Sequence, residues 1–291
     1  MKIILFSRKG ITPRIEDIDE IFGAIERYGF EYAINRSFAE NIEEFTSRTI
    51  PTEFIYDKEV GEQPEESVMV CYGGDGTLLE GVHRLAGADI PVVGINGGRL
   101  GFLALAPREK IDGVFADIAN RNLNLEVRNM LCVEYEIEGE RRELYALNEV
   151  SVQRLGAAMI SIEASIDGNS VSTYNGDGVI LSTSTGSTAY SLSAGGPIVA
   201  PSCRSFLLTP LAPHNLTMRP IVMPDSSEVS LHITTRNNEV LISADNRTFK
   251  IANNTLLNIK KAKRYIRLAV PHNISFFDSL RNKMMWGVDI R

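Results

Sequence analysis

The chain has 291 residues, a length that allows two domains with separate hydrophobic cores. Hydrophobic residues make up 44% and charged residues 23%, which is typical of a globular protein. The net charge of −7 argues against a general binder of nucleic acids or of anionic membranes. No apolar run approaches the length of a membrane span. The three cysteines lie far apart, and with no secretory signal segment we expect a cytoplasmic protein.

The first 120 residues or so alternate apolar runs with helical stripes, a pattern that predicts an α/β layer structure. Apolar runs that end at a turn predict buried strands of a parallel sheet. Apolar residues at helical spacing predict the helices between them. The expected strands are 2–7, 30–34, 68–72 and 91–96, and the expected helices are 16–28, 38–45, 77–85 and 111–118.

From about residue 123 the pattern changes to alternation of apolar and polar residues, which predicts strands with one buried face. Asp167-Gly168 is a strong hairpin turn, and Asn237-Asn238 is a second turn. We therefore expect a Rossmann-like α/β domain over residues 1–122 and a mostly antiparallel β domain over 123–271. Residues 272–291 contain Phe276, Phe277, Leu280, Met284 and Trp286, and we expect this tail to dock on the first domain. A frayed terminus is the alternative.

Gly73-Gly74-Asp75-Gly76 stands between a predicted buried strand and a predicted helix. Three glycines in four residues let another molecule approach the backbone, and amides beside a helix N-terminus suit an anion such as a phosphate. The single side chain in this turn is the carboxylate of Asp75, which makes it a candidate for chemistry. The alternative is a tight turn in which Asp75 caps the helix. The spacing matches neither a Walker loop nor a dinucleotide fingerprint.

Three further polar segments stand out from their apolar surroundings. A second strand ends in the glycine turn that contains Asn96, which suggests a crevice at the carboxyl edge of the sheet. Asn148-Glu149 places two adjacent polar residues within an apolar stretch, so that one of them faces inward and needs a partner. Seven of the nine residues from 183 to 191 carry hydroxyls, which suits sugar, phosphate and base recognition better than a flexible linker.

Taken in order, these motifs resemble those of the NAD kinase family. The shared elements are the Gly-Gly-Asp-Gly turn, the turn at Asn96 with Leu100-Gly101-Phe102-Leu103, Asn148-Glu149, and Asp177-Gly178 followed by residues 183–196. Similar glycine turns also occur in 6-phosphofructokinases and in diacylglycerol and sphingosine kinases. The stretch from 185 to 198 is far more specific, and the similarity extends from about residue 66 to 250.

The resemblance implies an enzyme that transfers the terminal phosphate of ATP to the 2′-hydroxyl of the adenosine ribose of NAD, giving NADP. It implies an α/β domain and a β domain with the active site between them. It also implies a homodimer or homotetramer and a divalent cation, Mg²⁺, that arrives with ATP. No residue of the chain is expected to be a dedicated metal ligand, and neither a nucleic acid nor a membrane is an expected partner.

The family's site residues carry over by motif. Asp75 is the expected proton acceptor, Gly76 lies against the substrate, and Asn96 joins the three glycines in the phosphate loop. Asn175 and Arg247 stand where many relatives have arginine and glutamine, so contacts there are expected to differ. The expected phosphate loop is Gly73, Gly74, Gly76 and Asn96, and the expected NAD-binding set is Asp75, Gly76, Asn148, Glu149, Asn175, Asp177, Thr188, Ala189, Tyr190, Ser191, Leu192, Ser193, Ala212 and Arg247.

Two alternatives remain open at this point. A lipid kinase of the diacylglycerol type would need a basic or apolar patch facing a membrane, which the acidic balance disfavours. A non-catalytic NAD sensor would have no need for the carboxylate of Asp75. Product formation from NAD and ATP distinguishes both from an NAD kinase.

Overall fold

The computed structural model describes residues 1–60, 63–64, 66–98, 101–272 and 274–285. Leu100 and Trp286, which the sequence analysis named, lie outside these residues. Contacts between Cα atoms divide the chain into two compact units. Unit 1 comprises Met1–Val127 and the chain from Ile266 onward, and unit 2 comprises Arg128–Tyr265. The domain limits expected at 122/123 and 271/272 stay a prediction.

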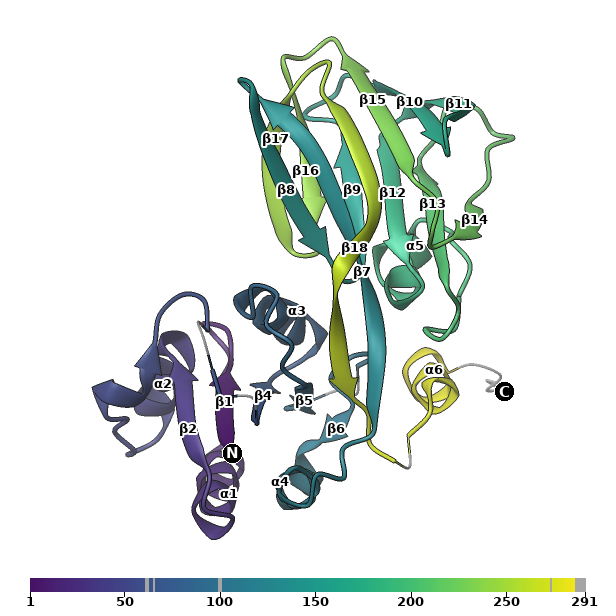
Figure 1. Ribbon diagram of the computed structural model, residues 1–291. Helices are drawn as coiled ribbons and strands as arrows, with labels where there is room; N and C mark the ends of the chain where they lie inside the picture. Colours follow the sequence, from purple (N-terminus) through teal and green to yellow (C-terminus); the bar gives the residue numbers. More distant parts are fainter. Residues whose placement is uncertain (61–62, 65, 99–100, 273, 286–291) are drawn as a thin grey trace. The chain divides into compact units, whose positions relative to one another are not determined.

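Unit 1 is built on a parallel sheet (Figure 1). The order is β5-β4-β1-β2-β3, with β6 beside the end of β5. The buried strands β1 and β4 are almost wholly apolar, as a sheet covered on both faces requires. These strands are β1 (Lys2–Phe6), β2 (Glu31–Asn35), β3 (Ile55–Tyr56), β4 (Ser67–Tyr72), β5 (Val92–Asn96) and β6 (Ala106–Pro107).

Five α-helices belong to unit 1, within the residues described. On α1 the buried side chains Ile18, Ile21, Phe22 and Ile25 repeat at helical spacing and join the core of the sheet. The helices are α1 (Ile15–Arg27), α2 (Arg36–Phe45), α3 (Asp75–Arg84), α4 (Ile111–Ala119) and α6 (Phe276–Met284), with 3₁₀ turns η1 (Thr52–Phe54) and η2 (Arg108–Lys110). The predicted α/β character of this half is confirmed.

Unit 2 is built from strands that pair antiparallel, as the sequence predicts. Six strands form one sheet in the order β14-β13-β12-β9-β16-β17, and the order β11-β10-β15-β18 with the β7-β8 hairpin forms the other. Side chains from both contribute to one hydrophobic core. The first sheet contains β9 (Glu149–Gln153), β12 (Gly178–Thr183), β13 (Ser205–Leu211), β14 (Ile221–Pro224), β16 (Glu239–Ala244) and β17 (Arg247–Ala252). The second contains β7 (Leu125–Ile137), β8 (Glu140–Ala146), β10 (Ile160–Ile166), β11 (Asn169–Gly176), β15 (Val229–Thr235) and β18 (Leu256–Ala269).

The two predicted turns of unit 2 differ in what they connect. Asp167 and Gly168 have φ of +51° and +76° and close the hairpin of β10 and β11, as predicted. Asn237-Asn238 instead joins β15 to β16, which lie in different sheets. The hairpin partner of β16 is β17, through Asp245-Asn246. Alternation predicts that a strand has one buried face, but it does not identify the neighbouring strand.

The end of β18 also has an unexpected neighbour. Leu268 and Ala269 pair in parallel with Val92 and Val93 of β5, so the last residues of this strand extend the sheet of unit 1.

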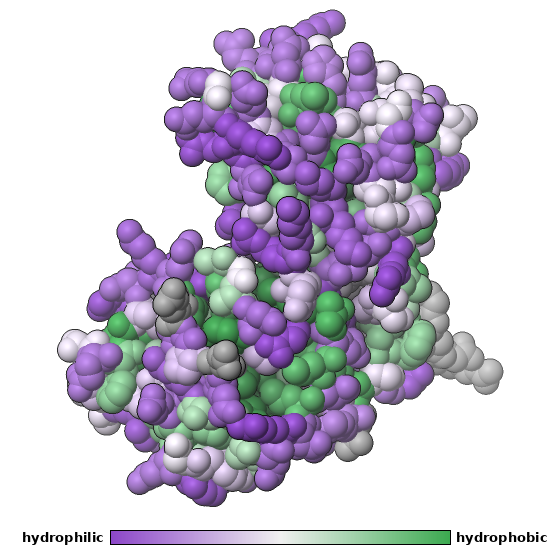
Figure 2. All heavy atoms as spheres, viewed as in Figure 1, coloured by the Kyte–Doolittle hydropathy of each residue, from purple (hydrophilic) through white to green (hydrophobic). Residues whose placement is uncertain are grey.

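Figure 2 shows mainly hydrophilic residues on the visible face of unit 2 and a group of apolar residues on that of unit 1. Among the described residues, no helix is long and apolar enough to cross a membrane.

Candidate active site

The Gly73–Gly76 turn connects β4 to α3 through a backbone shape that needs glycine. Gly73 has φ of +146°, and a Cβ on it would lie 2.4 Å from Oγ1 of Thr77. Its N–H donates to the carbonyl of Ile95, at 2.9 Å, which ties the turn to the neighbouring strand. Gly74 precedes the helix and Asp75 is its first residue, so Asp75 does not occupy the N-cap position. The turn presents backbone amides at the N-terminus of a ten-residue helix.

The carboxylate of Asp75 is held by a loop that passes over it. Oδ1 accepts the N–H groups of Leu103 and Ala104, at 3.0 and 2.9 Å, and Oδ2 accepts that of Phe102 at 2.9 Å. Nζ of Lys283, on α6, lies 3.4 Å from Oδ2. A Cβ on Gly101 would lie 1.8 Å from Oδ1, so a glycine is required for this approach. The direction of the carboxylate is therefore fixed by the loop.

The other residues of the predicted phosphate loop lie close to this carboxylate. A Cβ on Gly76 would lie 3.3 Å from Nη1 of Arg8, which follows β1, so a cation reaches the first turn of α3. Asn96 is buried, donates to the carbonyl of Ala104 and accepts from the N–H of Gly98. Ala104 thus contacts both Asn96 and Asp75. Asn96 therefore supports the loop from within.

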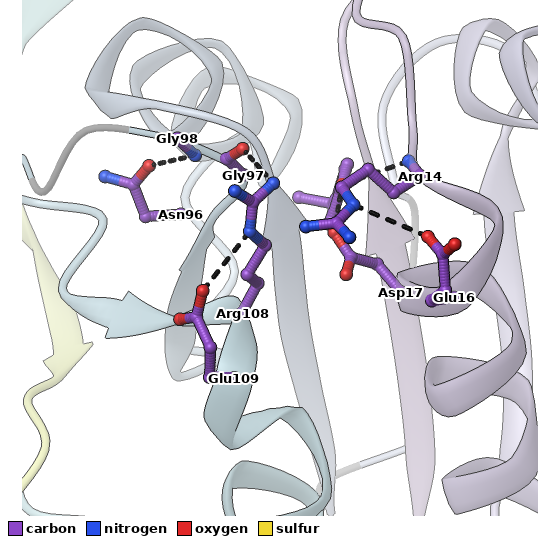
Figure 3. Close-up of polar contacts among 9 residues, drawn as sticks. Arg14, Glu16, Asp17, Asn96, Gly97, Gly98, Arg108 and Glu109 are labelled. Atoms are coloured by element: carbon purple, nitrogen blue, oxygen red, sulfur yellow. Dashed lines mark hydrogen bonds and ion pairs between the residues drawn. The ribbon is translucent and has the colours of Figure 1, made fainter.

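A polar cluster beside this turn was missed by the sequence analysis (Figure 3). The hydroxyl of Tyr72 donates to Oδ2 of Asp17 at 2.6 Å and accepts the N–H of Arg14 at 3.4 Å. Burial, followed by the bond to Asp17, raises the pKa of Tyr72. Nη1 of Arg108 donates to the carbonyl of Gly97 at 2.9 Å. Tyr72 thus ties α1 to the carboxyl end of β4, and Arg108 ties η2 to the turn after β5. A tyrosine within an apolar strand gave no signal of these contacts.

In unit 2, Asn148 precedes β9 and Glu149 begins it, and both lie against an aspartate that the sequence analysis did not name. Asp245, in the β16-β17 hairpin, accepts the N–H groups of Leu147, Asn148 and Glu149 at 2.8, 2.7 and 3.2 Å. Within the residues described, the buried Oδ1 of Asn148 and Oε2 of Glu149 make no hydrogen bond. Buried oxygens without partners are rare and suit a site that a ligand completes.

Glu149 has an unusual protonation behaviour. Its burial, followed by the negative charge of Asp245, raises its pKa from 4.5 to about 8, and the N–H of Tyr190 opposes the rise. At neutral pH its carboxyl group therefore holds a proton and can both donate and accept hydrogen bonds. That property suits recognition of a hydroxyl or of the edge of a base.

Two arginines lie near the other predicted NAD contacts of unit 2. Nη2 of Arg247 donates to the carbonyl of Tyr145 at 2.7 Å, while its buried Nε has no partner among the described residues. Burial lowers the pKa of Arg247, and Asp245 opposes that shift. Nε of Arg154 lies 2.5 Å from Oδ1 of Asp177, so Asp177 forms an ion pair within unit 2. Arg154 gave no signal in the sequence.

The hydroxyl-rich stretch is ordered structure and not a linker. It forms η3 (Thr185–Thr188) and α5 (Tyr190–Ser193), and Oγ of Ser191 lies 2.9 Å from Oγ1 of Thr209. A Cβ on Gly186 would lie 2.1 Å from the carbonyl oxygen of Asn148, so this stretch packs directly on β9. Thr188, Ala189 and Leu192 are partly buried, and Tyr190 and Ser193 are exposed.

Asn175 and Ala212 lie next to each other in unit 2. The carbonyl of Asn175 accepts the N–H of His214 at 2.7 Å, and a Cβ on Gly176 would lie 2.6 Å from the carbonyl oxygen of Ala212. Asp177 donates its N–H to Leu211 at 3.0 Å. The structure therefore gathers most of the predicted NAD contacts of unit 2 around β9, β12 and β13, and the predicted phosphate loop of unit 1 around the ends of β4 and β5.

One group of side chains in unit 2 has the spacing of metal ligands. The ligand atoms of Cys132, Glu134 and Glu143 lie within 4.8 Å of one another. Glu134, however, is bridged at 2.7 Å by both Arg141 and Lys260. Two cations on one carboxylate oppose the binding of a metal ion, so this cluster fits an ion-pair network better.

Comparison with known proteins agrees with the motifs. The family model of the ATP-NAD kinase N-terminal domain matches residues 38–123, and that of the ATP-NAD kinase C-terminal domain matches residues 147–270. An NAD kinase of Bacteroides fragilis is 34% identical over 292 residues, and one of Flavobacterium johnsoniae is 36% identical over 299 residues. In both cases the alignment covers 100% of this chain and 100% of the relative.

Solved structures share the fold at lower sequence identity. A yeast NADH kinase complexed with NADH superposes with a TM-score of 0.87 at 24% identity, covering 100% of this chain and 89% of that one. An NAD kinase from Archaeoglobus fulgidus in complex with ATP has a TM-score of 0.69 at 24% identity, covering 99% and 98%. The two family models and the curated relatives, which align over their full lengths, show that the chain belongs to the NAD kinase family.

Proposed function

We propose that this protein transfers the terminal phosphate of ATP to the 2′-hydroxyl of the adenosine ribose of NAD, giving NADP. The observation that carries the proposal is the carboxylate of Asp75, which three backbone amides hold at the start of α3 beside the glycine turn. Family membership supplies the substrates, and the fixed carboxylate supplies an acceptor for the proton that the hydroxyl must lose.

In the proposed reaction, the hydroxyl oxygen of NAD forms a bond to the terminal phosphorus while the bond from that phosphorus to the ADP oxygen breaks. The hydroxyl proton passes to Asp75. Phosphoryl transfer has a loose transition state, so catalysis consists mainly of positioning and of charge stabilisation. The amides from Gly74 to Gly76, at the N-terminus of α3, would hold the phosphates of the donor, because the amide of Gly73 already donates to Ile95.

The residues of unit 2 would bind the dinucleotide. Oδ1 of Asn148 and Oε2 of Glu149 are oxygens without partners among the described residues, and Nε of Arg247 is a donor in the same condition. Ribose hydroxyls and an adenine edge offer the complementary groups. We assign Asn175, Asp177, residues 188–193 and Ala212 to the same NAD-binding set, which the comparisons leave as a prediction.

The divalent cation, the assembly and the location complete the proposal. Mg²⁺ would neutralise the charge of the donor and take its ligands from phosphate and water. The carboxylate oxygens of Asp75 already accept three amides and contact an ammonium, so we do not assign Asp75 as a ligand of Mg²⁺. A homodimer or homotetramer in the cytoplasm remains our expectation from the family resemblance.

The test is NADP formation from NAD, ATP and Mg²⁺ by the wild type and by Asp75→Asn. We expect turnover to fall by about a hundredfold to ten-thousandfold in the variant, the range for loss of a general base, with NAD still bound. Asp19→Asn, at an exposed position on α1, is the matched control and should keep wild-type turnover. Unchanged turnover in Asp75→Asn would remove it from the mechanism. If the wild type neither forms NADP nor binds NAD, the result would favour the lipid-kinase alternative.

A further inference from the structure

The ammonium of Lys283 reaches the same carboxylate that the proposed function makes the proton acceptor. Its Nζ lies 3.4 Å from Oδ2 of Asp75 and 4.6 Å from the centroid of the Phe102 ring. Phe102 is itself the residue whose N–H donates to Oδ2. Lys283 therefore contacts the carboxylate both directly and through the loop that holds it.

The helix that carries Lys283 is attached to this loop at a second point. The rings of Phe276 and Phe102 have centroids 6.0 Å apart, and Ser275 and Asp278 form a capping box at the start of α6. Leu280 is buried, while the side chain of Lys283 is 40% exposed. The apolar side of the helix is thus anchored, and Lys283 extends from its last turn toward Asp75.

The proposed reaction creates an electrostatic problem at this position. A carboxylate and a phosphoryl group carry like charges, and both must approach the same hydroxyl oxygen from close range. The repulsion between two unit charges at such a distance is weak in water and several times stronger near a protein surface, where the effective dielectric constant is lower. A cation adjacent to both groups removes this repulsion without taking the proton, since an ammonium has no acceptor atom.

We propose that Lys283 screens Asp75 from the arriving phosphoryl group. This inference rests on the proposed function. Oδ1 and Oδ2 together accept three backbone amides, which the loop fixes, so the longer contact to the half-exposed lysine is the one that yields to the substrate hydroxyl. Once displaced, the ammonium remains beside the phosphoryl oxygens and stabilises their charge. The hydroxyl proton goes to Asp75, and Lys283 takes no part in its transfer.

The test compares Lys283→Met and Lys283→Arg with the wild type in NADP formation under saturating ATP and Mg²⁺. We expect Lys283→Met to lower kcat about tenfold, with KM for NAD within twofold of the wild type, because the loss falls on the transition state. Lys283→Arg should recover at least half of kcat. Arg281→Met removes a cation of the same helix that pairs with Asp278 and should leave kcat unchanged.

A second measurement separates the electrostatic role from a structural one. In Lys283→Ala, propylammonium chloride at tens of millimolar should restore activity several-fold, and tetramethylammonium chloride at the same concentration should not. A kcat within twofold of the wild type in Lys283→Met would overturn the inference. A loss of kcat matched by equal loss of NAD binding, without amine rescue, would also overturn it. A wild type that forms no NADP would overturn the proposed function, and with it this inference.

Discussion

The two carboxyl groups assigned to the proposed reaction, Asp75 in unit 1 and Glu149 in unit 2, have opposite surroundings. Asp75 accepts three backbone amides and contacts an ammonium, so its oxygens are well supplied with donors. Glu149 has one oxygen without a partner among the described residues and faces the negative charge of Asp245. Burial beside a like charge stabilises the protonated form of a carboxyl group.

This difference separates two tasks that a carboxyl group can perform. A carboxylate fixed by donors keeps its direction, as a proton acceptor in phosphoryl transfer requires. A protonated carboxyl group in a buried position can donate a hydrogen bond to a ligand and accept one from it. We infer that unit 1 supplies the chemistry and unit 2 supplies recognition, and that variants can break each environment separately.

The largest effect is expected where the backbone approaches Asp75. Gly101→Ala places a Cβ 1.8 Å from Oδ1 of Asp75, so either the loop or the carboxylate must move. We expect kcat to fall about a thousandfold, a loss similar to that of the general base itself. Steady-state NADP formation measures kcat, and a melting curve shows whether the variant is folded.

Gly98→Ala is the matched control, because nothing lies within 4 Å of a Cβ on Gly98. It should keep kcat within a few-fold of the wild type. If Gly101→Ala is as active as Gly98→Ala, the three backbone amides that hold Asp75 have no catalytic importance. The contrast between the surroundings of Asp75 and of Glu149 would then have no consequence for turnover.

Glu149→Gln tests the other carboxyl group through the pH dependence of stability. The folded protein has the pKa of Glu149 raised to about 8 from 4.5. The contribution of this group is therefore fully present below pH 4.5 and is lost as the pH rises toward 8. Each pH unit in this window lowers the free energy of unfolding by about 1.4 kcal/mol, so the wild type should lose about 2 to 3 kcal/mol between pH 5.5 and 7.5 relative to Glu149→Gln.

Urea unfolding of both proteins at several pH values gives the comparison. Glu16→Gln, at an exposed position of α1, serves as the control and should follow the wild type at every pH. A difference between Glu149→Gln and the wild type that does not vary with pH would show that Glu149 is ionised in the folded protein, and the two carboxyl groups would then resemble each other.

The contrast between these groups was only partly visible in the sequence. The glycine turn and the Asn148-Glu149 pair identified both carboxyl groups, because glycine near a strand end and adjacent polar residues in an apolar stretch are local signals. Their partners come from distant parts of the chain: Lys283 is 208 residues from Asp75, and Asp245 is 96 from Glu149. Local patterns predict which residues are unusual, and long-range packing decides what surrounds them.

The fold follows the same division. The alternation of strands and helices predicted the α/β unit, and period-two alternation predicted the β unit, since each pattern reflects burial of one face. The parallel pairing of Leu268 and Ala269 with β5 was not predictable, because nothing in an alternating strand specifies its neighbour. The assignment of β15 and β16 to different sheets was missed for the same reason.

The smallest expected effect concerns the donor side of unit 1. The carbonyl of Arg8 accepts the side-chain N–H of Asn41 at 2.9 Å, which fixes its backbone, and Nη1 lies 3.3 Å from the Cβ position of Gly76. If the donor phosphates lie on the amides of this turn, Arg8 contacts them. Arg8→Met should then raise KM for ATP about fivefold, near the 1 kcal/mol expected of an exposed charge-assisted contact.

The same variant should leave KM for NAD and the pH dependence of stability unchanged, because recognition of NAD is assigned to unit 2. Lys9→Met removes a neighbouring exposed cation and controls for a general loss of positive charge. A rise in KM for NAD with KM for ATP unaffected would reverse the assignment, since it would place the dinucleotide on the turn that holds Asp75. A rise in KM for ATP alone would support the assignment of the phosphate donor and the base to unit 1 and of NAD recognition to unit 2.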